Sequence, residues 1–123
     1  LGRYTSTPNG WGIATSIASA GDVRFYYGNT ALATTAGSVW SANTWTHVAA
    51  VRSSGTLKIY VNGVSQASVS DTTDLTAGNP LQIGANGSGG GTVNGYIDDL
   101  RITKGYARYT SNFTPPTAAL PNY

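Results

Sequence analysis

The chain of 123 residues contains no cysteine, no methionine and no glutamate. Without cysteine, the protein can form neither disulfide bonds nor thiolate metal sites. Only 10% of the residues are charged, against about a quarter in an average soluble domain. Gly, Thr, Ser, Ala and Asn fill the difference, and this composition favours strands and turns over helices.

The chain also lacks a basic cluster and a long apolar run. Its net charge of +2 and its pI of about 9.1 depend on an excess of two charges. The basic residues are scattered: Arg3, Arg24, Arg52, Lys58, Arg101, Lys104 and Arg108. Nucleic-acid binding needs a basic patch or stripe, so we expect no nucleic-acid partner. No segment has the pattern of a signal peptide or a membrane span, so we expect no membrane insertion.

The best-defined local pattern covers residues 43–63. Side chains alternate along its first half, and this alternation places Trp45 on the same face as Val51, which predicts that Trp45 belongs to the core. The pattern ends at Asn62-Gly63, a strong hairpin-turn signal. Residues 64–69 alternate again. The centre of the chain is therefore predicted to be a meander of three antiparallel strands.

Turn signals separate further short segments that favour strands. These segments are residues 11–17, 23–27, 30–35, 80–84 and 95–103, with a Gly-rich hairpin loop at residues 85–95. Residues 104–117 carry aromatic side chains at spacings of one helical turn and are predicted to form an ordered strap along the domain. About eight short strands and no convincing helix indicate one all-β domain, a sandwich or a barrel.

Two stretches resemble a known family. Residues 45–52 with residues 57–64 look like the core hairpin of laminin-G-like domains, which share the concanavalin A-like jelly roll with lectins, pentraxins and laminarinase-type glucanases. Residues 95–117 resemble the closing strand and tail of such domains, in a form associated with phage and environmental bacterial surface proteins. The resemblance implies an all-β, antiparallel jelly-roll sandwich.

The resemblance also exposes a gap at the N-terminal side. Domains of this family usually begin with further strands, and no such stretch precedes Trp11. The chain starts at Leu1 rather than Met, so we expect a processed product or part of a longer polypeptide, or a neighbouring chain that completes the sheet. We expect a partial sandwich over residues 1–116 and a C-terminal tail or linker over residues 117–123.

Catalysis is disfavoured by the supply of acidic groups. The resemblance implies a pair of carboxylates, usually glutamates, in the glucanase branch. The carboxylates here are Asp22, Asp71, Asp74, Asp98 and Asp99. The last two are neighbours on a predicted strand and point to opposite faces. The only histidine, His47, lies inside a predicted strand, which favours a structural imidazole over a general base. We therefore predict that the protein is not an enzyme.

Candidate ligand-binding residues are aromatic or amide side chains near turns. Sugars stack on flat aromatic faces, and Trp11 and Trp40 follow or border turns, although packing is the favoured alternative for both. Asn86 lies in the Gly-rich loop and is a candidate amide donor. The resemblance implies a structural calcium ion held by a carboxylate at the position of Asp98; the alternative is that Asp98 pairs with Arg101 or caps a turn.

These observations lead to one expected function and one alternative. We expect a non-catalytic structural or adhesion module that decorates a virion (capsid or tail fibre) or another extracellular assembly, with neighbouring chains as partners and with glycan recognition as a further role. The alternative is a carbohydrate-binding module of a secreted enzyme or adhesin. Strands that precede Leu1 in the same polypeptide would favour the alternative.

Overall fold

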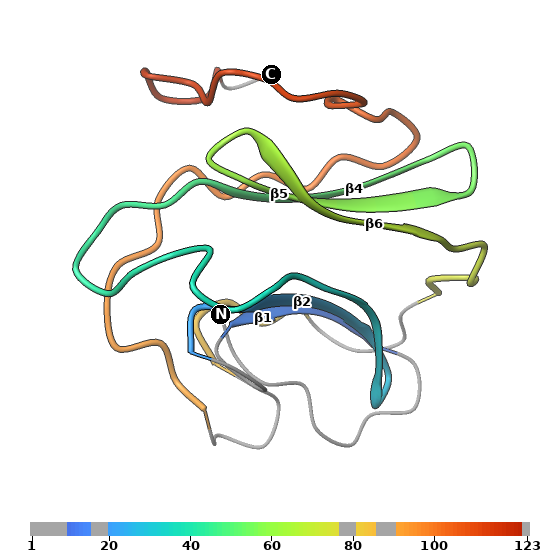
Figure 1. Cartoon of the computed structure of the whole chain (residues 1–123), viewed down its shortest axis with the longest axis horizontal. Coiled ribbons are helices and arrows are strands. Elements are labelled where there is room, and N and C mark those ends of the chain that lie inside the picture. The colour runs from blue at the N-terminus through green and yellow to red at the C-terminus, as the bar shows by residue number, and fades with distance from the viewer. Residues whose placement is uncertain (1–9, 16–19, 77–80, 86–90, 122–123) are drawn as a thin grey trace.

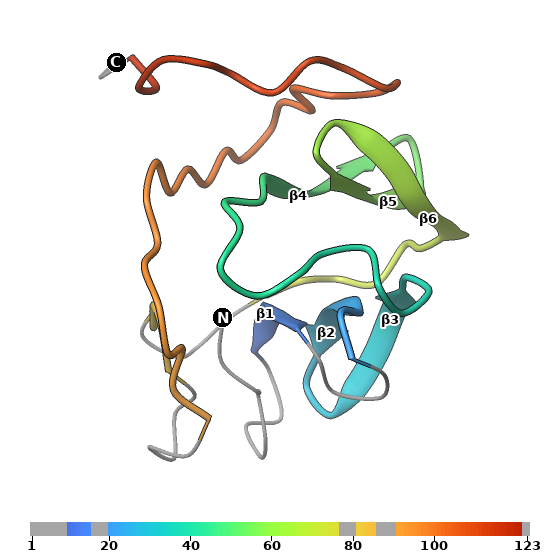
Figure 2. The same cartoon turned by 60° about the vertical axis from the view of Figure 1, so that its left-hand side comes forward.

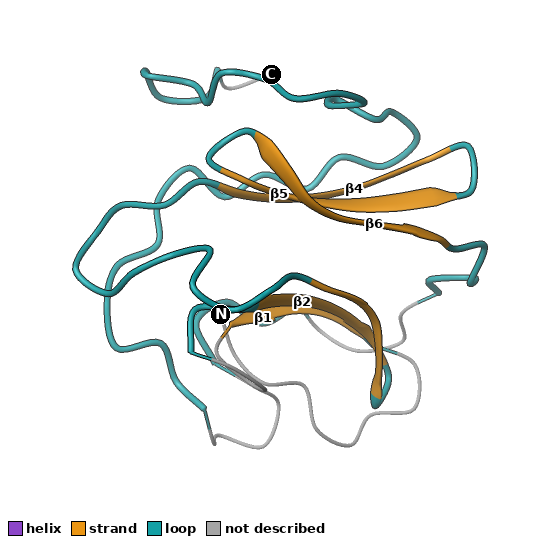
Figure 3. Ribbon diagram, in the orientation of Figure 1, coloured by secondary structure: helices purple, strands orange, loops and turns teal. Residues whose placement is uncertain are grey.

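The computed structural model describes residues 10–15, 20–76, 81–85 and 91–121. These residues form two antiparallel sheets and no helix (Figure 3). The strands are β1 (Trp11–Thr15), β2 (Val23–Tyr27), β3 (Thr30–Thr34), β4 (Val48–Ser53), β5 (Thr56–Val61) and β6 (Val64–Ser70). Since the described part has no helix, it has none that is long and apolar enough to cross a membrane.

The first sheet has the order β1-β2-β3. Trp11 lies opposite Tyr27 and Thr15 opposite Val23, so β1 follows β2 over its whole length. The pairing of β2 with β3 shifts between Phe25 and Tyr26, which marks a bulge. The sheet confirms the strands predicted around residues 23–27 and 30–35; residues 16 and 17 of the first predicted strand lie outside the described residues.

The second sheet is the predicted meander, with the order β4-β5-β6. Its two turns are Ser54-Gly55 and Asn62-Gly63, and all four residues have positive φ. Two consecutive residues with positive φ are the requirement of the tight hairpin turn that matches the twist of the strands. The turn chemistry of these two dipeptides therefore sets the register of the meander.

The core lies between the two sheets (Figure 1). Its buried members are Val23, Phe25, Ala33, Leu57, Ile59 and Val61. In the second sheet, Val48 lies opposite Val61 and Ala50 opposite Ile59, so these even-numbered residues of β4 face the core. The arrangement confirms an all-β sandwich and is consistent with a partial concanavalin A-like jelly roll.

The core position expected for Trp45 is wrong. Its side chain is 68% exposed, and it precedes β4, which begins at Val48. The alternation grouped Trp45 with Val51, but the core face of β4 carries the even-numbered side chains. The face that holds Val51 is the outer face of the sandwich.

The strands expected at residues 80–84 and 95–103 are also wrong for the described part. Residues 81–84 and 95–103 carry no strand. Asp99 has a φ of 48° and interrupts an extended backbone, and its own N–H bonds to the carboxylate of Asp98. Val93, at the end of the predicted Gly-rich loop, donates its N–H to Gly84 O at 2.8 Å. Residues 80 and 86–90 lie outside the described residues.

The C-terminal part runs along the sandwich, as the predicted strap does. After residue 91 the chain rises along one side of the two sheets and then lies over the second sheet, on the side away from the first (Figures 1 and 2). No helical turn forms around Tyr106, Tyr109 and Phe113. The second sheet is thus covered on both faces, by the core on one side and by the C-terminal part on the other.

Candidate binding site

The outer face of the second sheet supplies the floor of the candidate site. Val51 lies opposite Lys58, and Ser53 lies opposite Thr56. Directly opposed residues of an antiparallel pair share one face, so these four side chains form a patch on the outer face of β4 and β5. The patch joins hydroxyl groups, one ammonium group and one small apolar side chain.

Residues 109–115, the part of the predicted strap (residues 104–117) that is called the strap from here on, cross this outer face. Three hydrogen bonds attach the strap to the sheet: Phe113 N–H to Gly63 O at 2.9 Å, Ser65 N–H to Asn112 Oδ1 at 2.9 Å, and Lys58 Nζ to Thr110 O at 3.1 Å. The contact at Gly63 is close, because a Cβ at that position would overlap the carbonyl group of Phe113. Glycine is therefore favoured at this turn for two reasons: it adopts a positive φ without strain, and it lets the strap approach closely.

An aromatic cluster fixes the position of the strap over the sheet. The rings of Tyr109 and Phe113 stack with centroids 3.6 Å apart, and Phe113 meets Tyr60 and His47 edge-on at 5.4 and 5.5 Å. Burial lowers the pKa of His47 and raises the pKa of Tyr60. Both shifts favour the neutral forms, and among the described residues no carboxylate bonds to His47 to make it a general base.

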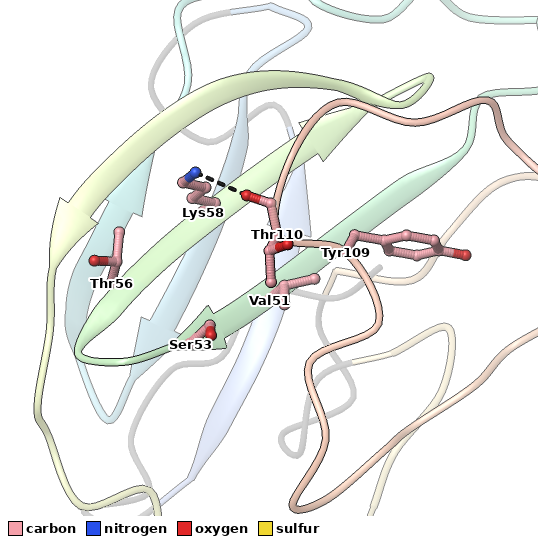
Figure 4. Close-up of a pocket in the computed structure, with 6 residues that line it drawn as sticks. All are labelled: Val51, Ser53, Thr56, Lys58, Tyr109 and Thr110. Carbon is pink, nitrogen blue, oxygen red and sulfur yellow. Dashed lines mark hydrogen bonds between the residues drawn. The ribbon is translucent and has the colours of Figure 1, made fainter.

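A shallow, open pocket of about 270 Å³ lies between the outer face and the strap. It is lined by Val51, Ser53, Thr56, Lys58, Tyr109 and Thr110, and this strap pocket is drawn in Figure 4. Ser53, Thr56 and Lys58 lie along the sheet, Thr110 stands beside them, and the ring of Tyr109 extends away from Lys58. None of the six lining side chains is acidic, so the pocket offers hydroxyl groups and one positive charge to a ligand.

The candidate residues from the sequence do not line this pocket. Trp11 is half-buried and stacks on Phe25 with centroids 6.2 Å apart. Trp40 is half-buried beside the core, and its Nε1–H donates to Asp22 O at 3.2 Å. Both contacts support the packing interpretation. Asn86 lies outside the described residues. A ligand role for these three residues stays a prediction.

The pocket residues were missed by sequence reasoning, although part of the signal was present. The alternation of β4 and β5 places Val51, Ser53, Thr56 and Lys58 on one face once the strands are paired. The position of Thr110 over that face depends on the course of the strap, which no local pattern encodes. Pairing the two predicted strands residue by residue would have identified the lining residues on the sheet, but not those on the strap.

Two of the aspartates have buried carboxylates that pair with partly exposed arginines. Asp22 accepts a hydrogen bond from Arg24 Nε at 3.0 Å, and Asp71 accepts one from Arg52 Nη1 at 2.9 Å. Burial alone would raise the pKa of Asp71, but hydrogen bonds from Thr73 and Arg52 outweigh it and hold that pKa below its usual range. A general acid needs a raised pKa, so Asp71 has the opposite character.

Asp98 bonds to the backbone of the next residue and does not pair with Arg101. Its Oδ1 accepts the N–H of Asp99 at 2.8 Å, while Arg101 donates to Pro121 O and not to an aspartate. Within the described ranges, no three His, Asp or Glu side chains lie close enough together to hold a metal ion. Calcium binding at Asp98 stays a prediction.

Comparison with known proteins bears on the fold and on the class of ligand. A laminin G family model, described as the concanavalin A-like lectin/glucanases superfamily, matches residues 2–108. Searches of curated proteins and of solved structures gave no match. The matched range contains all six strands and the segment 95–103, and it confirms the resemblance seen in the sequence.

Proposed function

Because the chain belongs to the concanavalin A-like lectin/glucanase superfamily, we propose that it is a non-catalytic adhesion module that recognises saccharides at the strap pocket. We place it on the surface of a virion or of another extracellular assembly. The observation that carries the saccharide proposal is the strap pocket, where hydroxyl groups from the sheet and the strap surround one lysine without an acidic neighbour among the lining residues.

The chemistry of the pocket suits a small polyhydroxylated ligand. Sugar hydroxyl groups donate and accept hydrogen bonds, and Ser53, Thr56 and Thr110 can do the same. Lys58 uses one of its three donors on Thr110 O, so two remain for a ligand. The volume of about 270 Å³ lies just below the range of drug-sized pockets, which suits one sugar unit at the end of a chain.

The roles of several titratable side chains in the fold favour a binding role. Glycoside hydrolysis needs two carboxyl groups on either side of one bond, with the pKa of the acid raised. The sequence has no glutamate, and Asp22 and Asp71 are buried in ion pairs. His47 is enclosed by aromatic rings. These commitments favour recognition without turnover.

A glycan-array screen of the protein tests the proposal, with and without a calcium chelator. We expect binding to a subset of glycans, and Thr56→Val should weaken that binding about tenfold, because the isosteric change removes one hydrogen-bonding hydroxyl group. Loss of binding with chelator would show that glycan binding depends on calcium; retention would show that it does not.

The matched control is Ser70→Ala. Ser70 lies opposite Thr56 on β6 and outside the pocket lining, so its loss should leave glycan binding unchanged. An array on which no glycan is retained, in either condition, would refute saccharide recognition. Equal loss of binding in both variants would show that the pocket is not the site.

A further inference from the structure

Residues 95–103 lie on the side of the sandwich and belong to neither sheet. No backbone–backbone hydrogen bond joins it to any other described residue. In Figure 2 this part of the chain, drawn in orange, stands apart from both sheets. Apart from the N–H of Asp99, which donates to Asp98 Oδ1, its backbone groups bond to no other backbone group among the described residues, and an added strand could pair with them as with a sheet edge.

The side chains of this segment are apolar and exposed to an unusual degree. Tyr96 is 89% exposed, Leu100 and Ile102 are each 52% exposed, and Ile97 is 40% exposed. Three of them, Tyr96, Leu100 and Ile102, would share one face of a strand with Asp98, and Ile97 would lie on the other face with Asp99 and Arg101. Exposed apolar groups in a strand pattern, next to unpaired backbone groups, mark a surface for strand addition.

We propose that residues 95–103 of two copies of this chain pair as antiparallel strands around a twofold axis that passes through Leu100. The resulting dimer would present two sandwiches, with their strap pockets, in one particle. This proposal goes beyond saccharide recognition, because the pairing needs no saccharide.

Charge complementarity selects both the second copy as the partner and the register. With the axis at Leu100, Asp99 lies opposite Arg101 of the second copy, and the symmetry repeats this pair. Axes at residues 98, 99 or 101 would each place a charged residue opposite its own copy, which is unfavourable. The register at Leu100 has no like-charge pair, and it places Leu100 against Leu100.

Formation of the dimer would replace two hydrogen bonds within the single chain, at Asp99 and Arg101, by contacts between the two copies. Asp99 has a φ of 48° and accepts the N–H of Leu120 at 3.2 Å, and Arg101 donates to Pro121 O at 2.9 Å. In the dimer, the carboxylate and the guanidinium bond to each other across the axis, and Asp99 becomes extended. Release of a positive φ at a residue other than glycine favours this exchange.

Sedimentation equilibrium over a range of protein concentrations tests the proposal. We expect the protein to form a dimer. Either Asp99→Arg or Arg101→Asp should weaken the dimer affinity about tenfold or more, because like charges would then face each other at both symmetric pairs of positions 99 and 101. The double variant Asp99→Arg/Arg101→Asp restores both opposite-charge pairs and should restore the dimer.

Asp98→Arg provides the matched control. It makes the same charge change one residue away, on the other face of the strand and opposite Ile102, so the dimer should persist. Circular dichroism of each variant would show that the sandwich is intact. A wild-type protein that stays monomeric at every concentration would overturn the proposal. A double variant that dimerises no more tightly than the single variants would also overturn it, independently of the result of the glycan array.

Discussion

Substitution of Gly63 by alanine should detach the strap from the outer face of the second sheet. Gly63 has a φ of 79°, and a Cβ there would overlap the backbone carbonyl of Phe113. Two effects therefore destabilise the variant: alanine is strained at positive φ, and the strap has to move away from the turn. Movement of the strap breaks the hydrogen bond from Phe113 N–H to Gly63 O.

The structure gives the size of the effect. An alanine in the left-handed region costs about 1–2 kcal/mol, and loss of the hydrogen bond costs about 0.5–1.5 kcal/mol. Removal of the half-buried Phe113 ring from Tyr60 and His47 adds about 1.5 kcal/mol, roughly half of the smallest loss for a fully buried phenylalanine. The free energy of unfolding should therefore fall by about 3–5 kcal/mol.

Gly55→Ala is the matched control, because it shares the strain without the contact. Gly55 lies in the other hairpin turn with a φ of 73°, and a Cβ there would meet only Thr72 Cγ2 at 3.6 Å. This variant should lose only about 1–2 kcal/mol in urea denaturation. If both variants lose the same free energy, the close contact between the turn and the strap does not stabilise the fold, and the argument fails.

Two further predictions concern polar atoms beneath the strap. The hydroxyl of Tyr60 is buried and has no hydrogen-bond partner among the described residues, so Tyr60→Phe should raise the free energy of unfolding by about 1 kcal/mol. A loss of stability in urea denaturation would reveal a partner for the hydroxyl. Burial lowers the pKa of His47, so the stability it contributes is complete above the unfolded value of about 6.5 and is lost as the pH falls through the lower folded value. Urea denaturation should show this loss between neutral and acidic pH, and His47→Phe should abolish the dependence in that window; an unchanged profile in this variant would show that His47 is not the cause.

The hairpins were predictable because they depend on neighbouring residues. β2 and the meander follow from the alternation of side chains and from the turn dipeptides, each of which acts within a few residues. Alternation could not say which of its two faces the core would cover. Trp45 was therefore assigned to the core, although the first sheet lies over the opposite face of β4.

Residues 95–103 show a second limit of local patterns. Their alternation is that of a strand, but a strand exists only where another backbone accepts its hydrogen bonds. The described residues offer no such partner, and Asp99 takes a positive φ instead. The pattern thus predicts the capacity to form a strand, and a partner decides whether the strand forms.

The amino-acid sequence by itself determined the fold class, the central meander and its turns, and the lack of glutamate that disfavours hydrolysis. Only the tertiary structure decided where the strap pocket forms. Lys58 and Thr110 are 52 residues apart and meet because the aromatic rings of the strap pack on His47 and Tyr60. Contacts at that separation depend on how the whole chain closes over the sheet, which the pattern of neighbouring residues does not encode.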